Sequence, residues 1–264
     1  MPGSRRNSIP HAGESLIMDH WLESVDKYYH ASDVIDVKLD SLGAAIVALA
    51  KYRLEYVITR LVASIGAVSA DDGLSVGFGS GNEFERTLYV IGLACRCFEC
   101  EGEGRTRVDR AVITALCDAV LRLYHQNHLA WADTPNGRSV ATQCMSAFTL
   151  LSKLYQSTVL EIVKKRCETV TENRAGSDVI STRLTCIAHL HLNVNGLIEL
   201  LDIVNGVFSM VVKETANNSL WCRRVIFELS NPLAACVRTW VGQNRDFLLV
   251  AHGQSDHDPS SSEI

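Results

Sequence analysis

The chain has 264 residues, of which 47% are apolar and 21% charged, and its formal net charge is −5. This balance excludes a disordered polypeptide, and the length is sufficient for one large domain or two smaller ones, each with its own core. Duplex DNA binding needs several basic residues on one face. The longest run of Lys and Arg here is only 164–166, so we expect no direct nucleic-acid binding.

The cellular location follows from the N-terminus, the apolar runs and the cysteines. Residues 1–14 are polar and lack the apolar core of a signal peptide. The candidate apolar run around 46–65 is interrupted by charges before it reaches the ~18–20 residues that span a bilayer. The nine cysteines are odd in number and mostly lie singly within apolar helical patterns, which indicates reduced thiols. We therefore predict an intracellular protein, in the nucleus or cytoplasm, without a membrane segment.

In chain order, apolar residues recur at helical spacing, and clean two-residue alternation is absent. The stripes that predict helices are Ile46, Leu49, Leu54, Val57, Leu61 and Ile65; Val112, Leu116, Val120 and Leu123; Phe148, Leu151, Tyr155, Val159 and Ile162; and Ile187, Leu190, Val194, Leu197 and Leu201. Polar or glycine-rich breaks are predicted at 69–81, 101–105, 134–137, 172–177 and 217–219. Asn231 followed by Pro232 predicts that one helix ends there and another begins.

These elements predict an all-α protein. Most connections are short, and short connections favour antiparallel neighbours. We expect a single-domain antiparallel helical bundle of about seven or eight helices over residues 15–253, between disordered tails at 1–14 and 254–264. A helical-repeat solenoid is the competing architecture, but no motif recurs at a fixed period of ~34–47 residues.

One cysteine cluster is the only local feature that suggests a site. The residues that would have to bind a zinc ion are Cys95, Cys97 and Cys100, with Cys117, His125 or His128 as a fourth ligand. Structural zinc sites usually contain two Cys-x2–4-Cys pairs, and a second pair is absent, so we interpret the cluster as packing and predict no metal ion and no cofactor. The chain also lacks a His-Glu-x-x-His motif and a P-loop. We expect no enzymatic activity.

A longer pattern resembles a known family. Asn82 is followed after twelve residues by Cys95-x-Cys97, then by an apolar helix that ends at residues 121–124, then by spaced Leu and Val residues over 190–201. This order is similar to the aflatoxin regulatory protein domain, which lies C-terminal to the zinc-cluster DNA-binding domain in fungal regulators of secondary metabolism. This chain has no cysteine before Cys95, so it lacks the zinc cluster. The resemblance implies a regulatory domain that acts through a protein partner, such as a DNA-binding regulator.

We therefore expect a non-enzymatic helical regulatory protein tied to transcription of a fungal metabolite cluster. One alternative is a helical interaction scaffold unrelated to transcription. Another is a helical enzyme or cofactor carrier that uses His125, His128 and the cysteine cluster. The residues expected to matter, all as packing positions, are Cys95, Cys97, Tyr124, Val194 and Leu197.

Overall fold

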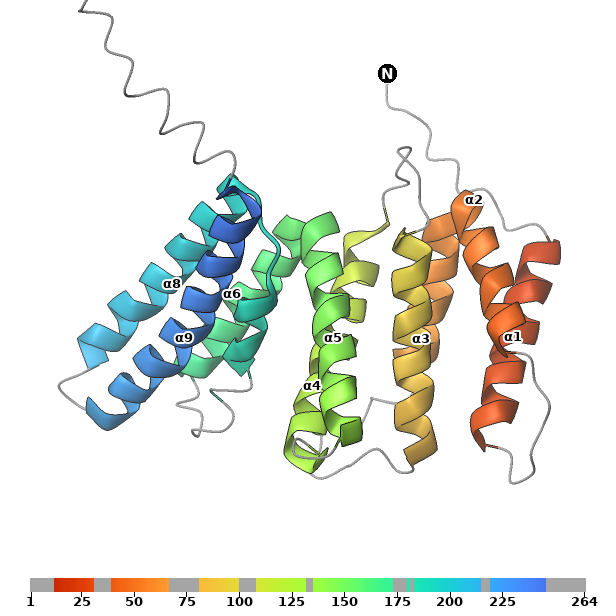
Figure 1. Cartoon of the computed structure of the whole chain (residues 1–264), viewed down its shortest axis with the longest axis horizontal. Coiled ribbons are helices and arrows are strands. Elements are labelled where there is room, and N and C mark those ends of the chain that lie inside the picture. Colours follow the sequence, from red (N-terminus) through yellow and green to blue (C-terminus); the bar gives the residue numbers. More distant parts are fainter. Residues whose placement is uncertain are drawn as a thin grey trace, which may run out of the picture. The chain divides into compact units, whose positions relative to one another are not determined.

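The computed structural model describes residues 12–30, 39–66, 81–99, 108–131, 135–172, 180, 183–214 and 219–245, to which the structural statements below are confined. The elements in chain order are α1 (Ala12–His30), α2 (Leu39–Gly66), α3 (Gly81–Glu99), α4 (Arg110–Trp131), α5 (Pro135–Leu154), α6 (Gln156–Glu172), the 3-10 helix η1 (Thr185–His189), α8 (Val194–Glu214) and α9 (Ser219–Gln243) (Figure 1). The predicted all-α class and the predicted number of helices are confirmed for this part of the chain.

The chain divides into two compact units, Met1–Ala147 and Phe148–Ile264, and the division falls within α5. The sequence led us to expect one body around one core. The difference arises because helices pack mainly on helices that are close in the chain. Helices α1 to α4 contact one another, and α6, η1, α8 and α9 contact one another, so two cores form.

The core of the first unit lies among α1, α2, α3 and α4. The predicted stripe on α2 is confirmed, since Ile46, Leu54 and Val57 are at most 1% exposed. Trp21 of α1 is also buried, and its ring stacks against that of Tyr89 of α3 with the centroids 6.4 Å apart. Stacked aromatic pairs stabilise a core beyond their buried area. The Trp21–Tyr89 pair therefore holds α1 against α3.

Arg86 of α3 joins three helices of this unit. Its Nε donates a hydrogen bond to Asp26 Oδ1 of α1 at 2.8 Å, and its Nη1 donates to the carbonyl oxygen of Ser64 in α2 at 3.2 Å. Ser64 lies in the last turn of α2, where carbonyl groups have no partner within the helix and where a cation is favoured. The guanidinium, whose side chain is only 9% exposed, therefore fixes the ends of α1 and α2 on α3.

The second unit is built from α6, η1, α8 and α9, together with the end of α5. Its two longest helices contribute buried stripes, which comprise Leu200, Val204, Val207 and Val211 on α8 and Cys222, Val225, Leu229 and Cys236 on α9. Two thiols of α9 link it to neighbouring segments. Cys222 donates a hydrogen bond to the carbonyl oxygen of Val211 at 3.3 Å, and Cys236 donates one to the carbonyl oxygen of Leu190 at 3.9 Å. Helices α8 and α9 thus form a packed hairpin (Figure 1).

Two predictions about this unit are wrong. The stripe from Ile187 to Leu201 is not one helix: residues 185–189 form η1, 190–193 are non-helical, and α8 begins at Val194. The side chain of Asn193 caps α8, since its Oδ1 accepts from the Gly196 N–H at 2.9 Å. Pro232 lies inside α9 and does not begin a new helix. Buried residues on both sides of it outweigh the lost hydrogen bond.

Three boundaries also differ from the predictions. Helix α1 begins at Ala12, so residues 12–14 belong to it and not to a tail; the buried Met18 and Trp21 anchor this helix, and extending an existing helix is cheap. Residues 135–137 open α5 with Pro135 in its first turn, a position where proline needs no N–H partner. The stripe from Phe148 to Ile162 crosses a bend at Tyr155, between α5 and α6. The remaining predicted tail residues, and breaks 69–80, 101–105, 173–177 and 217–218, lie outside the described residues.

Candidate functional site

The cysteine cluster does not form a metal site in the described part of the chain. Cys95 and Cys97 lie on α3, and Cys100 falls outside the described residues. Burial raises the pKa of the Cys95 thiol to about 12, with a smaller contribution from the Glu99 carboxylate. Zinc binds the thiolate, which this environment disfavours. Among the residues with assigned positions, no three His, Cys, Asp or Glu side chains are grouped to hold a metal ion.

The other candidate ligands are not gathered around these cysteines either. Cys117 is fully buried on α4, His125 is half-buried near the end of the same helix, and the side chain of His128 is not described. Cys144 of α5 lies near Cys95; burial first, and then the charge of Cys95, raises the pKa of Cys144 to about 12. These thiols are protonated at neutral pH and suit packing better than nucleophilic chemistry.

The expected packing positions have mixed outcomes. Cys97 is 1% exposed, as predicted, whereas Cys95, Tyr124 and Leu197 are half-buried. Val194 is 50% exposed, so its prediction as a core position is wrong. The cause is that α8 begins at Val194, because the start of the helix determines on which side of α8 the Val194 side chain lies. This exposure is the first sign of a larger apolar surface.

Exposed apolar side chains gather on the hairpin of α8 and α9. Nine of the thirteen large hydrophobic residues that are exposed in the described structure belong to these two helices. We call this set the α8–α9 face; it comprises Val194, Ile198, Leu201, Met210, Val212, Leu220, Ile226, Phe227 and Val241, of which Met210 lies apart, where α8 lines a groove with α6. Scattered exposed apolar residues are ordinary, but a concentrated set marks a contact surface.

The α8 half of the face follows from two apolar stripes on one helix. Three buried residues of α8 are each followed directly by an apolar residue of a second row, since Leu200 precedes Leu201, Val207 precedes Phe208 and Val211 precedes Val212. One residue step is about 100° round a helix. The second row therefore lies beside the buried stripe but faces outward. Ile198 and Val212 in this row are 54% and 64% exposed.

The α9 half combines apolar and basic side chains. Leu220, Phe227 and Val241 are separated by multiples of seven residues and are 80%, 62% and 44% exposed, so they lie along one side of the helix. The charged residues of α9 are Arg223, Arg224, Glu228 and Arg238. Arg224 pairs with Glu228, its Nε 3.1 Å from Oε1, and the Glu228 side chain is only 15% exposed. The exposed part of α9 is therefore apolar and positively charged.

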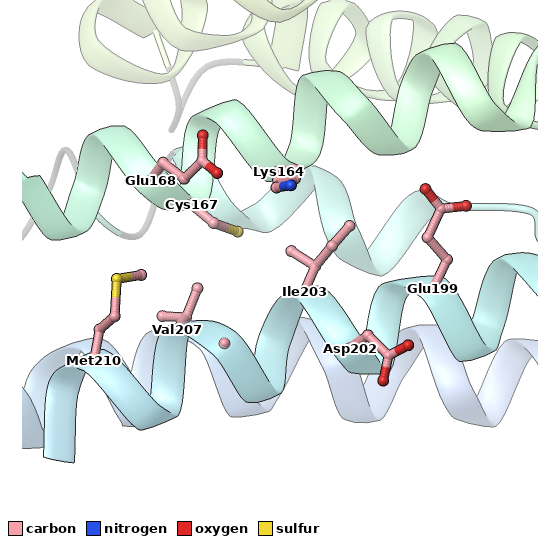
Figure 2. Close-up of a pocket in the computed structure, with 9 residues that line it drawn as sticks. Lys164, Cys167, Glu168, Glu199, Asp202, Ile203, Val207 and Met210 are labelled. Carbon is pink, nitrogen blue, oxygen red and sulfur yellow. The ribbon is translucent and has the colours of Figure 1, made fainter.

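A shallow groove lies between α6 and α8. It has a cavity volume of about 400 Å³ and is lined by Lys164, Cys167 and Glu168 of α6 and by Glu199, Asp202, Ile203, Gly206, Val207 and Met210 of α8. Figure 2 shows Cys167, Ile203 and Val207 between the two helices, with charged groups around them. Burial and the neighbouring Cys186 raise the pKa of Cys167 to about 12. The groove carries more acidic than basic groups. Because its one thiol is protonated, the groove offers no thiolate nucleophile.

Helix α8 also has the length and composition of a bilayer-spanning segment, which the sequence reasoning missed. Its stretch Val194–Lys213 has a mean hydropathy of 1.5, and only 28% of it is buried inside the structure. It is the one such helix in the described residues, and length and composition alone are weak evidence. Glu199 and Asp202 lie within the stretch, and each carboxylate would oppose insertion by roughly 3 kcal/mol. We therefore treat its exposed side as a surface for a partner.

No protein-family model matches the chain, and no curated protein matches it either. The candidate site accordingly depends on the surface itself. Apolar spacing alone could have located both rows on α8, since the row that contains Leu200 and the row that contains Leu201 repeat with the same heptad spacing. What sequence reasoning lacked was the helix start at Val194, which separates these rows from Ile187 and Leu190.

Proposed function

We propose that this chain is a non-enzymatic helical regulatory protein that acts by docking a protein partner on the α9 half of the α8–α9 face. The observation that carries the proposal is the concentration of nine exposed large hydrophobic residues on the hairpin, four of them on α9. Interface centres are enriched in aromatic and large apolar side chains, and Phe227 and Leu220 are the most accessible on α9. The protonated thiols of Cys95, Cys144 and Cys167 favour a binding role over nucleophilic catalysis.

The charge of α9 indicates the chemistry of the partner. Three arginines and one glutamate give this helix a net charge of +2. Arg223 and Arg238 are exposed on the same helix as the apolar row. A complementary partner carries apolar residues at helical spacing and acidic residues beside them. We therefore identify the occupant of the α9 half as an acidic amphipathic segment of another protein.

The resemblance to the aflatoxin regulatory protein domain supplies a context for this docking. Its elements fall on α3, which carries Cys95 and Cys97, on α4, and on the segment that runs into α8. Acidic and apolar residues are mixed in the activation segments of transcription regulators. On this basis the partner is a DNA-binding regulator of a fungal metabolite cluster. This chain would then modulate the regulator without contacting DNA.

A binding assay with defined probes tests the surface. Full-length protein is titrated against a fluorescent acidic amphipathic peptide, and fluorescence anisotropy reports binding. Leu220→Ser with Phe227→Ser should weaken binding at least about 30-fold, because central apolar anchors dominate such contacts. The matched control is Leu16→Ser on α1, which removes a leucine that is 69% exposed but lies outside the face. It should leave the affinity unchanged.

Two results would contradict the docking proposal. One is binding of the acidic peptide that the Leu220 and Phe227 substitutions do not affect. The other is sedimentation with anionic lipid vesicles through the same two residues in place of peptide binding. A reporter assay tests the context separately. If the chain changes no transcription beside a zinc-cluster regulator, while the peptide still binds, the scaffold unrelated to transcription becomes the better description.

A further inference from the structure

The exposed row on α8 has the spacing of a coiled-coil seam. Its six residues, which we call the α8 seam, are Val194, Ile198, Leu201, Asn205, Phe208 and Val212, all exposed except Phe208, which is half-buried. Successive members are separated by four, three, four, three and four residues, which is the alternation of positions d and a in a heptad. Eighteen residue steps at about 1.5 Å each make the seam about 27 Å long. Three a positions and three d positions are therefore available for contact.

We infer that the occupant of the α8 seam is a second copy of this chain, packed in parallel with α8 against α8. The inference rests on the proposed function in that the seam is part of the same α8–α9 face. It assigns the α8 half to self-association and leaves the α9 half for the acidic partner.

The residue types at each heptad position favour two strands. The spacing places Ile198, Asn205 and Val212 at position a, and Val194, Leu201 and Phe208 at position d. β-Branched residues at a with leucine at d favour parallel dimers. No residue of the seam is charged, so two copies meet without repulsion along the contact line. Val194, Ile198 and Leu201 are 50%, 54% and 43% exposed and remain available for such a contact.

Asn205 decides between a second copy and an unrelated apolar partner. It is exposed in the middle of an otherwise apolar seam. A primary amide both donates and accepts hydrogen bonds, so two Asn205 side chains can pair across a two-fold axis. In a parallel pair they meet in one layer. In an antiparallel pair Asn205 would face Leu201 and lose its partner, which costs more than the pairing gains. The seam therefore complements itself, in one orientation.

The neighbouring faces of α8 allow this arrangement. The side next to the seam carries Asn195, Asp202 and Ser209, all exposed. The opposite side is occupied by the buried stripe with Val204 and Val211. A polar margin on one side and the unit's own core on the other restrict the contact to the seam. A lipid surface fits less well, because Asn205 and Asp202 would enter the apolar layer unpaired.

The solution mass of the full chain tests the pairing. We expect sedimentation equilibrium, run from about 1 to about 100 µM, to give a dimer of the 29.1 kDa chain. Leu201→Asp should raise the dissociation constant at least about 100-fold, because an unpaired carboxylate enters the seam. Ile198→Asp should do the same, and both residues are exposed in the unit, so the circular dichroism should stay unchanged. A monomer across the whole range, or a dimer that survives both substitutions, would overturn the inference.

Cysteine cross-linking tests the orientation. Parallel packing predicts that Val194→Cys, and separately Val212→Cys, each form a covalent dimer under mild oxidation. The wild-type chain is the control, since all but one of its described thiols are buried. Cross-linking only when the two variants are mixed would indicate antiparallel packing and refute the role of Asn205. Asn205→Leu should tighten the dimer at least about 10-fold and allow both orientations; a weaker dimer would contradict the inference.

The two proposals fail separately. Leu220→Ser with Phe227→Ser should lose the acidic peptide and remain dimeric. Leu201→Asp should become monomeric and still bind the peptide. If the wild-type chain dimerises but does not bind the peptide, the seam inference stands and the docking proposal fails. If the wild-type chain is monomeric and binds the peptide, the docking proposal stands and the seam inference fails.

Discussion

Two glycines of α8 provide a matched test of how this helix is fixed in the second unit. Gly196 is buried in the first turn, and a Cβ at that position would overlap the side-chain amide of Gln156. Gly206 is exposed in the middle of the same helix, and a Cβ there would meet nothing within 4 Å. The same substitution, Gly→Ala, should therefore have opposite effects at the two positions.

The magnitude follows from the bonds that Gln156 makes. Its Oε1 accepts from the Asn193 N–H at 2.8 Å, and its Nε2 donates to Asn193 Oδ1 at 3.1 Å. Displacing the amide loses both bonds, at about 1 kcal/mol each, against a gain of about 0.5–1 kcal/mol from replacing a helical glycine. Gly196→Ala should lower the free energy of unfolding by about 1 kcal/mol. Gly206→Ala should raise it by about 0.5–1 kcal/mol.

Urea unfolding followed by circular dichroism measures this difference, which corresponds to a separation of the two midpoints by roughly 1 M. A third variant isolates the cause. In a Gln156→Ala background the obstruction is gone, so Gly196→Ala should no longer destabilise the protein, and the coupling between the two positions should be about 2 kcal/mol. Equal stabilisation by Gly196→Ala and Gly206→Ala in the wild-type background would refute the reasoning.

Two further predictions concern the buried polar groups. Arg86→Met removes the hydrogen bonds to Asp26 and to the Ser64 carbonyl and should lower the free energy of unfolding by about 2–3 kcal/mol, measured by urea titration. Asp26→Asn changes a side chain that is 53% exposed and should lower the free energy of unfolding by less. An equal loss in the two variants would argue against the contact of Arg86 with the end of α2. Burial holds the pKa of Cys95, Cys144 and Cys167 at about 12, above the ordinary 9.0, so the unfolded thiols ionise first and stability should fall from pH 9 towards pH 12. Cys144→Ala should flatten that decline, and an unchanged slope would contradict the assignment.

Apolar periodicity predicted the fold class because it reports which residues lie on one side of a helix. The stripes on α2 and α4 were predicted correctly, since Leu54 and Leu116 belong to long helices with buried sides, and residues on both sides of the kink of α2 at Arg53 are buried. The same periodicity placed Ile187 and Leu190 in one helix with Leu201, because η1 and the non-helical residues that follow preserve apolar spacing. Spacing does not show where the chain changes direction.

The local sequence signals at Pro232 and at the cysteines are of recognised kinds. The signal at Pro232 predicted the wrong structure, and the cysteine cluster did not predict where its members lie. Asn231-Pro232 has the form of a helix start, but Leu229 and Cys236 on either side are buried and keep α9 continuous. The clustered cysteines indicated a site only by their proximity in sequence. Their position on α3, with Cys97 buried, depends on tertiary packing that no short motif encodes.

The exposure of the α8 seam is not explained by the stability of the unit. Leu200 and Val211 already anchor α8 in the core, whereas Leu201 and Val212, one step round the helix, remain 43% and 64% exposed. Surface positions of this kind usually accept polar residues within about 0.5 kcal/mol. Apolar side chains there raise the tendency to associate and return almost nothing to folding. Their regular spacing, interrupted only by Asn205, is the property of a surface that is covered when the protein is assembled.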